Sequence, residues 1–118
     1  MQREFRLRHS ADFERLKTAG RQWRHPLMTL VTTPNGLPYN RFGFITSKRL
    51  GKAVIRNRVR RRLREVVRHA APQLKQGYDL LLIARDDLRD QPYNSIVQTF
   101  DELVRRAKLR RDSAESTP

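Results

Sequence analysis

The segment from Lys52 to Ala71 restricts the fold more than any other, because it can bury only one face of a single long helix. At 3.6 residues per turn its apolar side chains fall into one stripe, and Pro72 follows where that stripe ends. The stripe consists of Ile55, Val59, Leu63, Val66 and Ala70, with Val67 at its edge. The sequence therefore predicts an amphipathic helix that packs on an apolar layer such as a sheet.

The polar side of this helix carries charge of almost one sign. Between Lys48 and Arg68 there are ten basic side chains and one acid, Glu65. Solvated helices normally mix both signs, which gives attractive pairs one turn apart and avoids repulsion. Helical spacing places five polar residues within about 100° of one another, opposite the stripe: Asn57, Arg60, Arg61, Arg64 and Arg68. Arg56, Arg58 and Arg62 flank them, while Lys48, Arg49 and Lys52 precede the helix.

Such crowding of arginine predicts a polyanion as the partner, because guanidinium groups bind phosphate oxygens through paired hydrogen bonds. The formal net charge of +14 over 118 residues agrees with this interpretation. Nucleic acid is the leading class of partner, and an anionic membrane surface is the weaker alternative. The residues alone do not separate RNA from DNA. RNA is favoured, because the sequence shows no helix-turn-helix, zinc-finger or heptad pattern.

The remaining patterns predict a small sheet covered by helices. A first helix over 11–19 has Ser10 as its cap and Gly20 as its stop, and a last helix covers 93–109. "LMTLVTT" (27–33) and "RFGFITS" (41–47) alternate and predict an antiparallel hairpin across "PNGLPYN". "GYDLLLIAR" (77–85) predicts a strand covered on both faces. The fold class is therefore α+β, with one domain over 1–109 and a disordered tail over 110–118.

The sequence predicts no catalytic or metal site in the protein itself. It contains no cysteine, which excludes disulfides and thiolate chemistry. Three aspartates stand close together, but no further carboxylates lie at ligand spacing, so a loop and helix start is the better interpretation: Asp86, Asp87 and Asp90. The histidines are scattered, without a nucleophile or a metal partner nearby: His9, His25 and His69.

The hydropathy of the chain argues against a membrane. Its longest apolar run, "LLLIA" at 80–84, is far too short to cross a bilayer, and the basic start is not followed by an apolar stretch. The sequence therefore predicts a cytoplasmic protein.

Three blocks of the sequence resemble the bacterial ribonuclease P protein family. "FGFITSKRLGKAVIRNRVRRRLREVVR" is similar to the family signature, whose hallmark Arg-Asn-Arg is here Arg56, Asn57 and Arg58. "FRLRHSADFERLKTAGR" and "GYDLLLIAR" resemble its other blocks, in the same order, so that the resemblance covers 5–109. It implies a two-layer α/β sandwich, ribosomal protein S5 domain 2-like, in the order α-β-β-β-α-β-α. A short strand near 21–24 is added, and the βαβ crossover through the arginine helix is left-handed, against the usual preference.

The resemblance also implies a function. Members are the protein subunit of an endonuclease that removes the 5′ leader from precursor tRNA; the RNA subunit is the catalyst, and Mg²⁺ is held mainly by RNA. The implied partners are the catalytic RNA and precursor tRNA, with no membrane and no protein oligomer required. The residues that would meet the catalytic RNA are Arg56, Asn57, Arg58, Arg60, Arg61 and Arg64. Four neighbouring cations extend this predicted RNA-binding set: Arg68, Lys48, Arg49 and Lys52.

A second surface is implied between the first helix and the sheet, where the single-stranded leader would lie. Phe13 matches an aromatic position of the family and would stack on a base, although its helical position equally allows a core role. Where members carry a further aromatic residue and a tyrosine, this chain has Lys17 and Val31. Attraction of phosphate by Lys17 would then replace part of the stacking. The alternative for the whole chain is a structural RNA-binding protein of the ribosome or its assembly.

Binding to RNA should weaken steeply as salt is added. Each neutralised phosphate contributes a slope of roughly −0.9 to log K against log salt for duplex DNA, and about −0.7 for single strands. Replacing Arg60, Arg61 and Arg64 by alanine should flatten that slope, which titrations at several salt concentrations measure. An unchanged slope would show that this face is not the contact, and equal affinity for duplex DNA at matched salt would indicate nonspecific binding.

Overall fold

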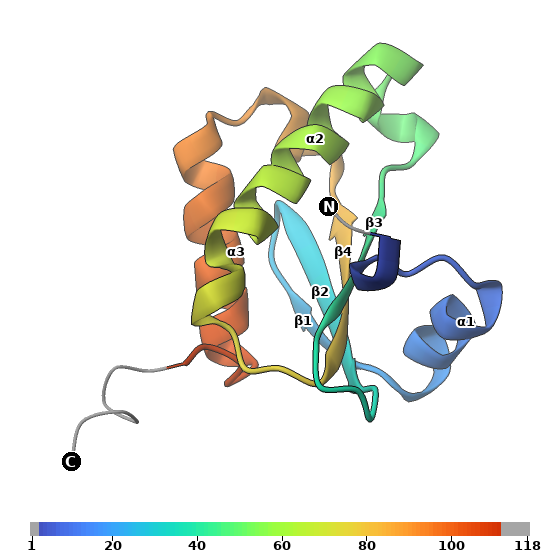
Figure 1. Ribbon diagram of the computed structural model, residues 1–118. Coiled ribbons are helices and arrows are strands. Elements are labelled where there is room, and N and C mark those ends of the chain that lie inside the picture. The colour runs from blue at the N-terminus through green and yellow to red at the C-terminus, as the bar shows by residue number, and fades with distance from the viewer. Residues whose placement is uncertain (1–2, 112–118) are drawn as a thin grey trace.

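The computed structural model describes residues 3–111, and its elements follow the order that the resemblance implies. The strands are β1 (Arg21–Arg24), β2 (Met28–Pro34), β3 (Arg41–Ile45) and β4 (Tyr78–Ala84). The α-helices are α1 (Ser10–Ala19), α2 (Ala53–Ala70) and α3 (Tyr93–Arg106). Figure 1 shows their arrangement. Ser10 is the first residue of α1 rather than its cap, and the predicted loop after β4 contains a 3₁₀ helix, Asp86–Asp90.

The two strands joined by the "PNGLPYN" loop do not form a hairpin. The sheet order is β1-β2-β4-β3, so that β4 lies between them. Leu82 of β4 is opposite Leu30 of antiparallel β2 and opposite Phe44 of parallel β3. The predicted hairpin is therefore wrong. The observed order has a physical reason. β4 is the most apolar strand, and a position between two strands removes both of its edges and most of its side chains from water.

The connection from β3 through α2 to β4 is a crossover between adjacent parallel strands. In Figure 1 β3 runs upward, α2 passes in front of the sheet, and β4 lies to the left of β3. This is the left-handed sense that the resemblance implies, opposite to the sense of nearly all such units.

The two faces of the sheet pack against different helices. On one face α2 and α3 form the main core: Val59, Leu63 and Val66 of α2 are at most 2% exposed and pack with Leu30 and Leu82. This confirms the predicted apolar stripe. On the other face α1 forms a smaller core, whose buried residues are Leu7, Leu16, Val31 and Leu81. The sandwich therefore has a partial third layer.

A buried ion-pair network fixes α1 to the sheet. The carboxylate of Asp79 on β4 is fully buried and accepts hydrogen bonds from Nε and Nη2 of Arg41, each at 2.9 Å. Arg15 of α1 donates to the same carboxylate, and Asn35 donates through Nδ2 at 3.0 Å. Arg41 also reaches Asp12 of α1, at 3.3 Å. The hydrogen bonds to Asp79 raise the pKa of Arg41 above its ordinary value, against the opposing effect of burial.

The chain stays structured beyond the predicted end of the last helix. Leu109 is buried, and Arg110 forms a β-bridge with Leu74 and an ion pair with Asp101. The sequence assigns Arg110 and Arg111 to the tail, whereas the structure pairs both with the segment after α2. The rest of the predicted tail, 112–118, lies outside the described residues.

Replacing Asp79 by asparagine should lower the free energy of unfolding by about 3 kcal/mol, because two arginines lose a buried counter-charge. Urea denaturation measures the change. The matched control is Asp86→Asn, whose carboxylate is 3.2 Å from Arg49 in an exposed pair and should contribute less than about 0.5 kcal/mol. Equal effects of the two variants would contradict the role given to the buried network.

Candidate nucleic-acid interface

The outer side of α2 presents the predicted polar face. Asn57, Arg58, Arg61 and Arg68 are exposed along the helix, and no other element covers them in the described part of the chain. Arg60 and Arg64, by contrast, are only half-exposed, because they lie at the edge of this face and lean toward β3. The sequence thus predicts the face correctly, while the structure divides it into an exposed centre and a partly covered edge.

Arg60 is held in place by two neighbours. Its Nη2 donates to Oγ1 of Thr46 at 2.7 Å, and its Nη1 donates to Oδ1 of Asn57 at 3.1 Å. The Asn57 oxygen is therefore engaged inside the protein, which leaves the amide N–H groups of Asn57 as its donors to a partner. The central residue of the Arg-Asn-Arg motif fixes the orientation of an arginine one turn further along.

Three arginines converge on a groove between α2, β3 and the N-terminal segment, residues 5–7. This arginine groove has a volume of about 250 Å³. It is lined by Arg6, Leu7, Phe42, Gly43, Phe44, Arg60 and Arg64, with no carboxylate among these described residues. Burial lowers the pKa of Arg64, and the charges of Arg6 and Arg60 lower it further. The Nε atom of Arg64 is buried without a hydrogen-bond partner, so that an anion in the groove would relieve both repulsion and an unsatisfied donor.

Arg6 lines this groove, and sequence reasoning did not include it among the candidate residues. It joins the groove because the N-terminal segment pairs with the edge strand β3: Arg6 forms a parallel bridge with Phe42, and the N–H of Leu7 donates to the Phe42 carbonyl at 2.8 Å. Its only sequence signal is the basic composition of the first residues, which specifies no partner.

The other predicted RNA-binding cations differ in how available they are. Lys48, Arg49 and Lys52 are exposed before α2, with Arg49 paired to Asp86. Arg56 is half-buried, and its Nε has no hydrogen-bond partner. Arg68 is paired with Glu65, and this hydrogen bond lowers the pKa of Glu65.

Arg62 lies on the other flank of the helix, where its Nη1 donates to the carbonyl of Gln91 at 3.2 Å. It therefore ties α2 to the segment before α3 and is not part of the exposed face.

The surface beside α1 contains two of the three predicted leader contacts. Phe13 is half-buried against the smaller core, and Lys17 is exposed. Val31, however, is only 2% exposed in that same core, so the prediction that it contacts the leader is wrong: α1 covers it. Ile45 and Ile83 are half-buried there and supply the apolar surface instead. Sequence reasoning missed them because it paired the strands wrongly.

The described residues do not fit a magnesium site. Among residues 3–111 no three His, Asp or Glu side chains are grouped so that they could hold a metal ion. The most buried carboxylate, Asp79, already accepts from Arg41, Arg15 and Asn35. None of the described helices is long and apolar enough to cross a membrane.

Comparison with known proteins identifies the family. A family model described as Ribonuclease P matches residues 1–108. The chain belongs to the ribonuclease P protein family. The ribonuclease P protein component of Roseiflexus castenholzii is 38% identical over the whole of this chain and 98% of its own length. That of Chloroflexus aggregans is 43% identical over 92% of this chain and 82% of its own.

Solved ribonuclease P proteins share the fold. The structure from Staphylococcus aureus superposes with a TM-score of 0.82 at 27% identity, covering 89% of this chain and 96% of that one. The structure from Thermotoga maritima gives 0.78 at 26% identity, covering 85% and 96%. The chain is therefore the protein subunit of an endoribonuclease of tRNA processing, and nothing in these comparisons supports the ribosomal alternative.

Adjacent arginines of α2 offer a direct test of the exposed face. Replacing Arg61 by alanine should weaken RNA binding by up to about eightfold at about 0.1 M salt, the effect of one phosphate contact. Arg62→Ala removes the same charge but should leave affinity nearly unchanged, since its guanidinium is engaged by Gln91. Filter binding with a structured RNA at fixed salt compares them. Equal losses would mean that net charge matters and not the face.

Proposed function

We propose that the exposed face of α2 and the arginine groove bind the catalytic RNA of ribonuclease P. The observation that carries this proposal is the convergence of Arg6, Arg60 and Arg64 on a groove without a carboxylate among its described lining residues. A fold gains nothing from such repulsion by itself, whereas a phosphate backbone neutralises it and releases counterions. The exposed Arg61 and Arg58 extend the same contact along the helix.

The surface beside α1 binds the 5′ leader of precursor tRNA in this proposal. Phe13, Ile45 and Ile83 offer apolar surface there, and the exposed Lys17 offers a charge for the backbone. An aromatic ring with a nearby cation suits a flexible single strand, whose bases are free to stack, better than a duplex. β3 and the N-terminal segment lie between this surface and the arginine groove, so one protein can hold the RNA subunit and the substrate together.

The chemical step in this proposal belongs to RNA. Bound Mg²⁺ would supply activated water and stabilise the leaving oxygen, and it would be held mainly by the RNA subunit, because residues 3–111 contain no grouped ligands for it. The protein contributes neutralisation of phosphates and added affinity for the leader. Since its partners are the catalytic RNA and precursor tRNA, we place the protein in the cytoplasm.

Reconstitution with the cognate catalytic RNA tests the proposed function. At near-physiological Mg²⁺, adding the protein should produce cleavage of a leader-bearing precursor tRNA at the mature 5′ end. A reaction in which the protein makes no difference would overturn the proposal. RNA alone at high Mg²⁺ shows that the catalytic RNA is folded and active.

Leader recognition should depend on Phe13 and Lys17. In the reconstituted holoenzyme Phe13→Ala should lower affinity for leader-bearing precursor by about tenfold, the effect of one lost base stack. Lys17→Ala, which removes no core contact, should have a smaller effect that fades at high salt. Mature tRNA without a leader is the control ligand, and both variants should bind it as the unaltered holoenzyme does. Equal losses for both ligands would exclude a leader contact.

A further inference from the structure

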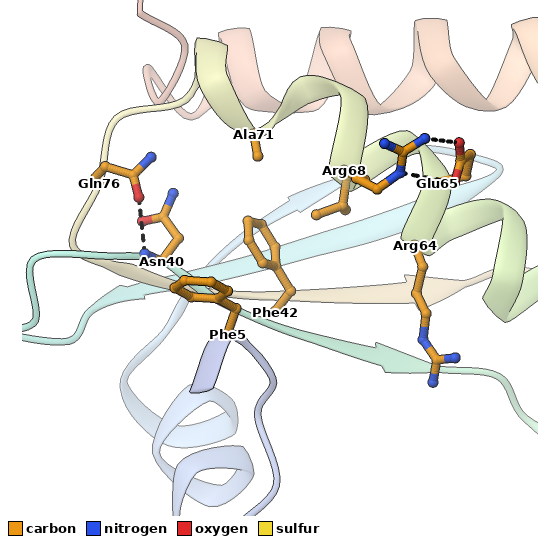
Figure 2. A pocket seen from close by; sticks show the side chains of 9 residues that line it. Phe5, Asn40, Phe42, Arg64, Glu65, Arg68, Ala71 and Gln76 are labelled. Atoms are coloured by element: carbon orange, nitrogen blue, oxygen red, sulfur yellow. Dashed lines mark hydrogen bonds and ion pairs between the residues drawn. The ribbon is translucent and has the colours of Figure 1, made fainter. Parts of the chain in front are cut away.

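A second cavity lies under the C-terminal half of α2, beside the arginine groove. Its volume is about 310 Å³, which is within the range of small-molecule sites. It is lined by Phe5, Asn40, Phe42, Arg64, Glu65, Val67, Arg68, Ala71 and Gln76. Figure 2 shows Phe5 and Phe42 side by side below α2, with Ala71 above them, the two amide side chains at one end and Arg64 at the other. We call it the aromatic pocket.

The aromatic walls of this pocket are held in position. Phe42 is 5% exposed and is fixed in the main core. Phe5 is half-buried, and its ring packs edge-on against Tyr39, with centroids 5.3 Å apart and planes at 79°. Val67 of α2 and Ala71, the residue directly after α2, complete an apolar lining. The pocket therefore offers a rigid site for a flat, apolar ring system.

The polar end of the pocket is organised by hydrogen bonds. Asn40 is buried, and both polar atoms of its side chain are hydrogen-bonded: its Nδ2 donates to the Lys75 carbonyl and its Oδ1 accepts from the Tyr78 N–H, each at 2.8 Å. Gln76 accepts from the Asn40 N–H at 3.2 Å and donates to the Leu74 carbonyl at 3.0 Å. Its amide nitrogen carries a second N–H, and its oxygen has a second lone pair, which suit the polar edge of a ring.

The aromatic pocket adjoins the arginine groove. Phe42 and Arg64 line both cavities, so that an apolar compartment with aromatic walls lies next to a compartment with three converging arginines. These are the two chemistries of a nucleotide, a flat base and an anionic phosphate. The positive charge beside the pocket favours an anionic ligand over an apolar peptide or lipid chain.

We propose that the aromatic pocket binds one unpaired base of RNA, whose phosphate occupies the arginine groove. The inference rests on the proposed function insofar as RNA is the partner, and it adds a contact that reads an extruded base rather than backbone alone. Arg64, between the compartments, would contact the phosphate, and Phe5 and Phe42 would enclose the base.

Three small probes separate base binding from phosphate binding. Adenosine 5′-monophosphate carries both groups, ribose 5-phosphate lacks the base, and inorganic phosphate lacks the sugar as well. NMR titration of the full chain should show adenosine monophosphate binding roughly tenfold more tightly than ribose 5-phosphate, as stacking on aromatic side chains implies. Equal affinities would overturn the proposal, because the base would then contribute nothing.

Two neighbouring alanines provide a matched pair of variants. Ala71→Leu fills the aromatic pocket, whereas Ala70→Leu adds the same side chain beside it, toward the cavity between α2 and α3. Ala71→Leu should abolish the tighter binding of adenosine monophosphate while leaving the affinity for ribose 5-phosphate unchanged. Ala70→Leu should retain the full difference in affinity between the two probes. If Ala71→Leu retains it and Phe13→Ala loses it, the base binds beside α1 and the pocket proposal is wrong.

Failure of the pocket and failure of the proposed function give different results. Urea denaturation first establishes that both leucine variants are folded. If the nucleotide test fails while replacement of Arg60, Arg61 and Arg64 still flattens the salt slope, only the pocket is excluded. If the protein also makes no difference to cleavage in the reconstituted holoenzyme, the proposed function fails as well. If the pocket proposal is correct, Ala71→Leu weakens binding to the RNA subunit but leaves the slope of log K against log salt unchanged.

Discussion

The burial of β4 between β2 and β3 is the constraint on which the rest of the structure depends. Both edges of this strand are paired, and five of its seven residues are buried. Because β3 must reach it through a parallel crossover, α2 is forced across one face of the sheet and exposes its arginines on the outside. The other face is left for α1, where the Asp79 carboxylate at the start of β4 holds Arg15 and Arg41. Both candidate RNA surfaces are therefore positioned by one apolar strand.

The arginines of α2 oppose the folding that displays them. Between residues 48 and 68 only Glu65 is acidic, and it forms a pair with Arg68. Arg64 has its pKa lowered by burial and by two neighbouring arginines, so its positive charge is less favourable in the folded protein than on a free arginine. Selection for stability alone would not keep this arrangement, and such local conflict is typical of functional sites. The apolar stripe of α2 offsets the repulsion by burying Val59, Leu63 and Val66.

The features that the sequence predicts correctly are local in the chain, whereas the features that it misses depend on residues far apart in sequence. The stripe of α2 and the buried character of β4 are periodic local signals, and the structure confirms both. The sheet order is nonlocal: turn residues at "PNGLPYN" favour a hairpin, and nothing nearby shows that β4 competes for the same edges. The omission of Ile83 follows from that pairing, whereas Val31 was taken from a position of the family and is covered by α1. Arg6 and Phe5 were missed because a single bridge, Arg6 to Phe42, brings them to the site.

The N-terminal segment has a consequence for the thermodynamics of binding. It is fastened to β3 by the Arg6–Phe42 bridge and the hydrogen bond from Leu7, yet it supplies Phe5 to the aromatic pocket and Arg6 to the arginine groove. When a ligand contacts this segment and α2 together, its binding favours attachment of the segment to β3. By thermodynamic linkage, attachment of the segment raises the affinity for the ligand by the same factor. Docking of residues 5–7 onto the sheet edge and occupancy of the two cavities are thus linked equilibria.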